Sequence, residues 1–173
     1  MEEVAVTEQP LYASEFGFSD DEWGLLVGLP QSVLTAASAA ESDGSRRTRT
    51  ENAAGLESIA AGRESASPLV AAVAGELITR VGDPEVGEEL PAIEPADPKA
   101  YIADVLSRAE SASKLLASRV SEGEAGAYRH WLLTIAEHVV TAASTGGVLG
   151  LGGDEVTEQE RRFRDELSHV LND

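Results

Sequence analysis

The segment from Tyr128 to Ser144, YRHWLLTIAEHVVTAAS, is a long apolar stretch around which the rest of the chain can be arranged. Its apolar residues recur every three or four positions, the spacing that places them on neighbouring turns of an α-helix. A strand would instead show an alternating run of β-branched and aromatic residues, and the chain contains no such run. A length of 173 residues suits one domain. The sequence therefore predicts an all-α, single-domain bundle of about six helices.

A second apolar segment of this kind follows the sequence SDDE at residues 19–22, which is a capping box and predicts the start of a helix. This helix is expected to run to about residue 40. The apolar residues at positions 25–34 cover most of its circumference, as in a helix surrounded by others. Pro30 removes one backbone donor, so we expect a kink there. The two apolar helices are predicted to form the centre of the bundle.

The two apolar segments also resemble each other, which suggests a degenerate internal repeat. Shifted by 106 positions, IAEHVVTAAS at residues 135–144 lies over LPQSVLTAAS at residues 29–38. A few residues further on, Thr50-Glu51 falls close to Thr157-Glu158. We therefore expect helices 1 and 2 of the bundle to correspond to helices 5 and 6.

Cap residues mark the remaining elements. Glu41 to Arg49 contains no apolar residue and is interpreted as a polar turn, after which Thr48 to Glu51 caps a short helix over Ala53 to Ala61. Other helix starts are predicted at Ser67-Pro68, Asp97-Pro98, Ser121 to Glu124 and Thr157 to Glu160. The domain organisation is then an N-terminal arm over 1–18, which Tyr12, Phe16 and Phe18 attach to the core, and a helical domain over 19–173. Its halves, 19–82 and 97–173, are joined by an acidic, proline-rich connector over 83–96.

Charge limits the classes of partner. The chain has 31 acidic and 13 basic residues and a formal net charge of -18, which repels phosphate backbones and anionic lipid headgroups. Nucleic acid and membrane are therefore not expected partners. There is no cysteine, the start of the chain is acidic, and no apolar run reaches the roughly 20 residues of a membrane span, so we expect a cytoplasmic location. The acidity fits either a high-salt cytoplasm or a GC-rich genome, and the sequence leaves both open.

Several patterns that could carry chemistry have simpler structural interpretations. The glycine-rich loop at residues 146–153 lacks the Lys-Ser/Thr of a P-loop. Glu166 and His169 form one Glu-x-x-His pair, whereas a di-iron bundle needs two. His130 and His138 stand too far apart on one helix to share a metal ion. No catalytic residue and no cofactor site is predicted, and an enzyme is the third-ranked interpretation.

Two arginine clusters occupy corresponding positions in the two halves. Arg46, Arg47 and Arg49 repeat as Arg161, Arg162 and Arg164. One interpretation is that they balance the surrounding acids. The other is a site for an anion or an acidic partner, because guanidinium groups bind carboxylates in a bidentate manner.

Acidic residues lie between the paired helices in both halves. Asp43-Gly44 leads to Glu51, and Gly153-Asp154-Glu155 leads through Thr157 to Glu160. This arrangement resembles the repeated unit of TerB-like helical proteins of the tellurite-resistance class, and the chain is also similar to uncharacterised helical proteins of high-GC bacteria. The TerB resemblance implies a divalent-cation site, for Ca²⁺ or Mg²⁺, and a role in stress-response complexes. The residues it implicates are Asp43, Glu51, Asp154, Glu155 and Glu160.

The sequence thus leads to a non-enzymatic cytoplasmic protein that acts through a protein partner, as an interaction or accessory module. The alternative is a weak divalent-cation module of the TerB type. The oligomeric state is not predicted.

Overall fold

The computed structural model describes residues 16–40, 44–82, 95–145 and 158–172, with the side chains of 44–50, 81, 143–145 and 158–160 outside the description. These ranges contain six α-helices, one short 3-10 helix and no strand, so the predicted all-α class is confirmed. The helices are α2 (Asp20–Ala39), α3 (Gly44–Ala61), α4 (Pro68–Val81), α5 (Pro98–Arg119), α6 (Glu122–Thr145) and α7 (Glu158–Asn172), and the 3-10 helix η1 spans Gly62–Glu64.

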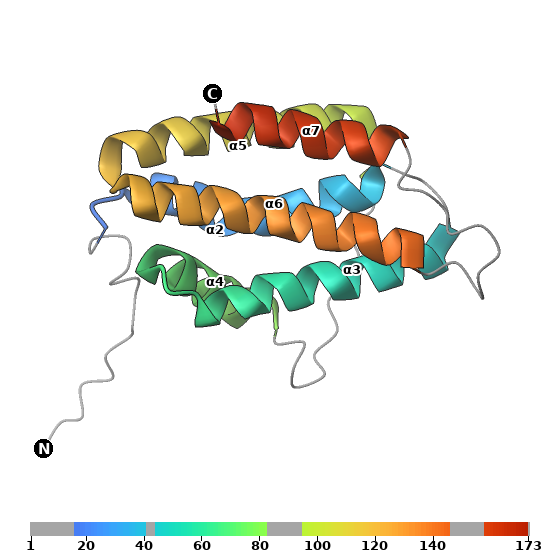
Figure 1. Cartoon of the computed structure of the whole chain (residues 1–173), viewed down its shortest axis with the longest axis horizontal. Helices are drawn as coiled ribbons and strands as arrows, with labels where there is room; N and C mark the ends of the chain where they lie inside the picture. Colours follow the sequence, from blue (N-terminus) through green and yellow to red (C-terminus); the bar gives the residue numbers. More distant parts are fainter. Residues whose placement is uncertain (1–15, 41–43, 83–94, 146–157, 173) are drawn as a thin grey trace, which may run out of the picture.

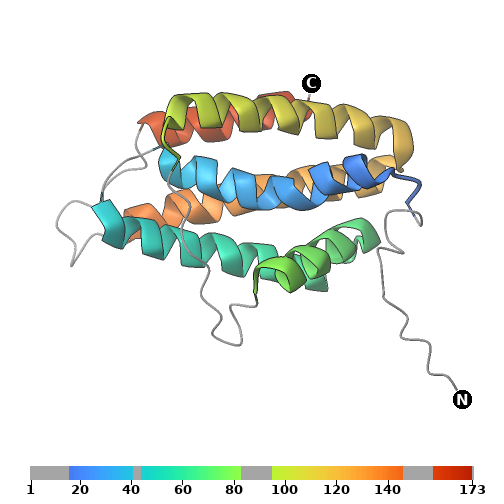
Figure 2. The same ribbon diagram turned by 180° about the vertical axis from the view of Figure 1, so that it is seen from behind.

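The helices lie in three layers, with α2 and α6 in the middle (Figure 1). Helices α5 and α7 cover one side of this central pair, and α3 and α4 cover the other, as the view from behind also shows (Figure 2). Helices α2 and α6 pack directly against each other. The prediction that the two apolar helices form the centre of the bundle is therefore confirmed.

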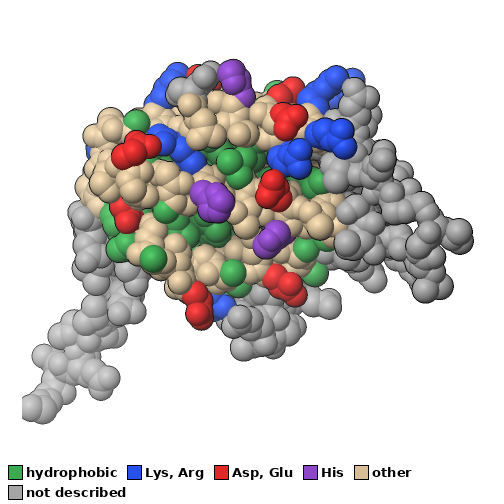
Figure 3. Space-filling model, in the orientation of Figure 1, with side chains coloured by type: hydrophobic (Ala, Val, Ile, Leu, Met, Phe, Trp, Pro, Cys, Tyr) green, Lys and Arg blue, Asp and Glu red, His purple; other side chains and the backbone are tan. Residues whose placement is uncertain are grey.

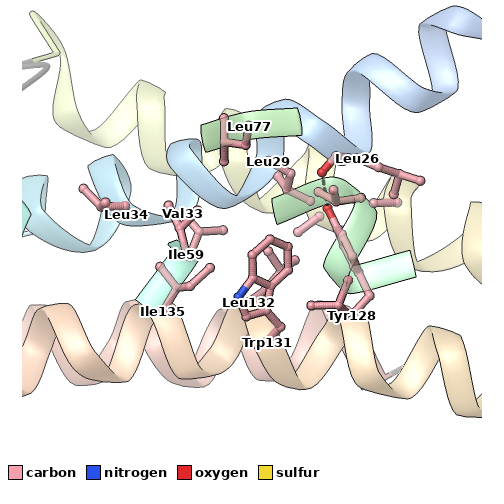
Figure 4. Close-up of a cluster of buried hydrophobic side chains, with 14 of the residues drawn as sticks. Leu26, Leu29, Val33, Leu34, Ile59, Leu77, Tyr128, Trp131, Leu132 and Ile135 are labelled. Carbon is pink, nitrogen blue, oxygen red and sulfur yellow. Dashed lines mark hydrogen bonds between the residues drawn. The ribbon is translucent and has the colours of Figure 1, made fainter. Parts of the chain in front are cut away.

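The core between the layers is apolar and closed to solvent. On α2, Leu29 and Val33 are fully buried, and on α6, Leu132 and Ile135 are fully buried. Figure 4 shows these side chains converging from the two central helices, together with Ile59 of α3 and Leu77 of α4. Fully burying a large aliphatic side chain contributes about 1.5–3 kcal/mol, so the all-round apolar pattern of α2 and α6 accounts for their central position.

Pro30 lies inside α2 without ending it, and Tyr128 of α6 supplies what the proline removes. In a regular helix the N–H of residue 30 would donate to the carbonyl of Leu26, but proline has no N–H. The buried Tyr128 hydroxyl donates to the Leu26 carbonyl oxygen instead, at 2.7 Å (Figure 4). The central pair is thus joined by a hydrogen bond at the position where α2 lacks one of its own.

Two glycines on the α3 side allow close contact with the central layer. A Cβ atom at Gly55 would collide with the Leu34 side chain of α2. A Cβ atom at Gly62 would lie 2.7 Å from Nε1 of Trp131 on α6. That indole nitrogen donates to the Ser58 carbonyl at 3.2 Å, which fixes the ring against α3. Glycine at these positions lets α3 and η1 approach the centre closely.

The cap signals mostly predicted the helix starts correctly. The capping box of α2 is present in both directions, since the Glu22 N–H donates to Ser19 Oγ at 3.2 Å and the Ser19 N–H donates to Glu22 Oε1 at 2.9 Å. Helices α4 and α5 begin after the N-caps Ser67 and Asp97, each with proline at the first position. Phe16 and Phe18 stack on Trp23, as expected of the arm, while Tyr12 lies outside the described residues.

The predicted capping box at Ser121 forms in one direction only. The Glu124 N–H donates to Ser121 Oγ at 3.3 Å, as expected. The Glu124 carboxylate, however, accepts hydrogen bonds from Ser67 Oγ at 2.8 Å and from the Leu69 N–H at 3.0 Å. Its second role is therefore to cap α4, because the packing of α4 on α6 brings unsatisfied backbone donors within its reach.

The predicted start of the second helix was wrong. Helix α3 begins at Gly44, so most of the segment interpreted as a polar turn is helical. Glu51 consequently lies within the helix rather than in a capping box at its start. The physical reason is that arginine and glutamate favour helices, and the first turns of a helix at the end of a bundle need no apolar residues.

The packing of the two proposed repeat units is not equivalent. Helix α3 lies along α6, whereas α7 packs mainly against α5 and α6 and touches α2 only slightly. The internal repeat therefore remains a prediction from sequence.

Candidate functional site: the face formed by α6 and α7

The residues implicated in cation binding are only partly within the described chain. Asp43, Asp154 and Glu155 lie outside it, and of Glu160 only the backbone, in α7, is described. Glu51 is 2% exposed, and its Oε2 accepts a hydrogen bond from Ser38 Oγ of α2 at 2.7 Å. Over the described ranges, no three His, Asp or Glu side chains are grouped so as to hold a metal ion.

Both arginine clusters lie in the first turns of their helices, at the same end of the bundle. Arg46, Arg47 and Arg49 belong to the start of α3, and their side chains are outside the description. Arg161 and Arg162 are exposed near the start of α7, and Arg164 is half-buried. Figures 1 and 2 place both helix starts beside the C-terminal end of α6.

Helix α7 directs its arginines outward because its apolar residues face the core. Phe163, Leu167 and Leu171 follow at four-residue spacing and are buried. Arg161 lies one turn before Arg164 and on the same side of the helix. Arg164 borders α6 along the seam between the two helices, and Arg161 follows this side of α7 one turn toward the helix start.

A groove of about 220 Å³ runs along this seam. Histidine and charged side chains gather on the face of the molecule over α6 and α7 (Figure 3). The groove is lined by His130, Leu133, Thr134 and Glu137 from α6 and by Arg164, Asp165 and Ser168 from α7. We call this set the α6–α7 groove.

The arginines of α7 differ from arginines elsewhere in their ion pairs. The side chain of Arg164 is 32% exposed, and its guanidinium lies 3.7 Å from Asp165 Oδ1, beyond hydrogen-bond distance. Among the described residues, neither Arg161 nor Arg162 is joined to a carboxylate. Four other arginines have close partners: Arg80 with Glu76 at 2.8 Å, Arg108 with Asp104 at 2.9 Å, Arg129 with Glu122 at 3.1 Å and Arg119 with Glu22 at 3.2 Å.

The hydroxyl groups of the groove have local hydrogen bonds. Thr134 Oγ1 donates to the His130 carbonyl at 2.9 Å, and Ser168 Oγ accepts from Asn172 Nδ2 at 3.5 Å. No hydrogen bond between described residues joins His130 to Ser168 or to Asp165. The groove therefore contains charged groups suited to binding but no assembled pair of nucleophile and base.

The other sequence candidates lie at the surface. His130 and His138 are exposed on α6, and Glu166 and His169 are exposed on α7. The glycine-rich loop lies outside the described residues. The sequence did not predict the groove, although the spacing of His130, Thr134 and Glu137 places these residues on one side of a helix.

No helix in the described ranges combines the length and the apolar character needed to cross a membrane. Compared with protein-family models, curated proteins and solved structures, the chain matches none.

Proposed function

We propose that this chain is a protein-interaction module that binds a partner through the face formed by α6 and α7. The observation that supports the proposal is that, among the described residues, none of the α7 arginines has a carboxylate at hydrogen-bond distance. In a chain with a net charge of -18, carboxylates are abundant, and arginines elsewhere in the bundle have them at hydrogen-bond distance. If the α7 arginines served only to balance nearby acids, they would be expected to make similar close pairs.

The shape of the face also favours binding of a protein over chemistry on a small molecule. The groove is partly open, and its volume of about 220 Å³ is below the roughly 300–1,000 Å³ typical of small-molecule sites. Arginine is enriched at protein interfaces, where its planar group can form several hydrogen bonds at once. An accessory protein of the cytoplasm that recruits a partner in this way is the function we propose.

Site-specific photo-crosslinking in cells of the native host tests the proposal. A photoreactive residue at Arg161, on the proposed surface, is compared with one at Lys114, which is 75% exposed on α5 and pairs within its own helix. We expect a discrete protein adduct from position 161, its loss when Arg162→Glu is added, and no equivalent adduct from position 114. The same adducts from both positions, or none above background from position 161, would contradict the proposal.

A further inference from the structure

Within the proposed function, we infer that the α6–α7 groove binds an acidic side chain of the partner and that Arg164 is the anchor for its carboxylate. Arg164 combines three properties that suit this role. It lines the groove, its side chain is only 32% exposed, and its ion pair with Asp165 is too long for a hydrogen bond. A partly desolvated arginine without a hydrogen-bonded carboxylate thus borders the space that a partner side chain would enter.

A carboxylate is the chemical group that fits these donors. The fork of the guanidinium can donate two parallel hydrogen bonds to the two oxygens of one carboxylate. A pair formed in a groove is also screened by salt less than a pair on an open surface. Arg161 lies one turn away on the same side of α7 and His130 lines the groove, so further acidic residues of the partner segment can pair along the seam.

The groove also contains groups that oppose a carboxylate. Glu137 and Asp165 line it together with Arg164, so its two carboxylates outnumber its one guanidinium. A bound carboxylate must approach these two acids, which limits the affinity. Removing one of them is therefore expected to strengthen binding, in contrast to the removal of Arg164.

Binding of a fluorescent hexaglutamate peptide to the full chain tests the inference. The titration is made at about 1 M salt, where a screening length of about 3 Å reduces the repulsion by the net charge. We expect saturable binding that Arg164→Gln weakens about tenfold, because a charge-assisted hydrogen bond is worth roughly that factor. The matched control is Arg108→Gln, because Arg108 is 34% exposed but already pairs with Asp104 at 2.9 Å.

Removal of an acidic side chain from the groove provides a second measurement, in which the inference predicts a gain of binding rather than a loss. Glu137→Gln is expected to tighten hexaglutamate binding several-fold. The inference would be overturned by the absence of saturable binding, by equal losses in Arg164→Gln and Arg108→Gln, or by no gain from Glu137→Gln. Crosslinks from position 161 that survive Arg164→Gln would leave the interaction function standing and remove only the role of Arg164.

Discussion

The buried Tyr128 and the proline inside α2, Pro30, are related through the carbonyl group of Leu26. Burial raises the pKa of Tyr128 well above its usual value, because the core disfavours the charged phenolate. A buried hydroxyl also needs a hydrogen-bond partner. The Leu26 carbonyl serves as that partner because Pro30 leaves it without its helical donor. The Tyr128 hydroxyl thus has an acceptor, and the carbonyl that Pro30 leaves without its helical donor has a hydrogen bond.

Removing the Tyr128 hydroxyl should therefore destabilise the fold in a way that depends on Pro30. Tyr128→Phe is expected to lower the free energy of unfolding by about 1–3 kcal/mol, because the Leu26 carbonyl is left buried and unsatisfied. Ala at position 30 restores an N–H donor, so Pro30→Ala should be more favourable in the Tyr128→Phe background than in the wild type. Urea denaturation of the four proteins gives the coupling energy. Simple additivity of the two changes would show that the residues act independently.

The same residue predicts a pH dependence. Because the pKa of Tyr128 is raised in the folded state, its contribution is fully present below its ordinary value of about 10.0. Above that pH the unfolded chain releases the proton while the folded chain retains it, so stability falls as pH rises further. The Tyr128→Phe variant should lose less stability over the same range when unfolding is followed by circular dichroism. Parallel curves for the two proteins would argue against this assignment.

Alanine substitutions at Gly55 and Gly24 are expected to change the stability of the fold in opposite directions. At Gly55 a Cβ atom would meet Leu34, so Gly55→Ala should destabilise the fold by about 1–3 kcal/mol. At Gly24 of α2 nothing lies within 4 Å of an added Cβ atom, so Gly24→Ala should stabilise the fold by about 0.5–1 kcal/mol. Thermal unfolding of both variants distinguishes close packing from simple helix propensity. Changes of the same sign would mean that contact with Leu34 is not decisive.

At the scale of the elements, the sequence predicted what is encoded locally. The Ser19 capping box and the Ser67-Pro68 and Asp97-Pro98 starts depend on residues within one turn of each other, and the structure confirms all three. The central position of α2 and α6 also follows from a local property, the apolar residues around their circumference. No partner helix has to be known for these predictions.

The predictions that failed depended on tertiary contacts. Glu124 matches the capping-box pattern, but its carboxylate caps α4, which no sequence spacing could indicate. Glu51 was expected to cap the start of its helix, and it instead lies buried within α3 beside Ser38 of α2. The groove was missed for the same reason, because α6 and α7 form it only by packing together.

The whole molecule carries a formal net charge of -18, and its self-repulsion should make stability depend on salt. The screening length falls from about 10 Å at 0.1 M to about 3 Å at 1 M, so the urea midpoint should rise with added NaCl. A protein adapted to a high-salt cytoplasm should lose its helical circular dichroism at low ionic strength. One whose acidity reflects genome composition should remain folded there. A midpoint independent of salt would show that the repulsion does not affect stability.

The effect of divalent cations on the melting temperature would distinguish the interaction module from the TerB-like alternative. Glu51 is 2% exposed and accepts a hydrogen bond from Ser38, so binding an ion outside the bundle would require it to leave that position. We therefore expect Ca²⁺ or Mg²⁺, added in a high background of NaCl, to change the melting temperature little and without saturation. A cation held by the folded state alone would instead raise it with a mass-action dependence. A saturable rise at micromolar metal, abolished by Asp154→Asn with Glu155→Gln, would favour the cation module over the interaction module.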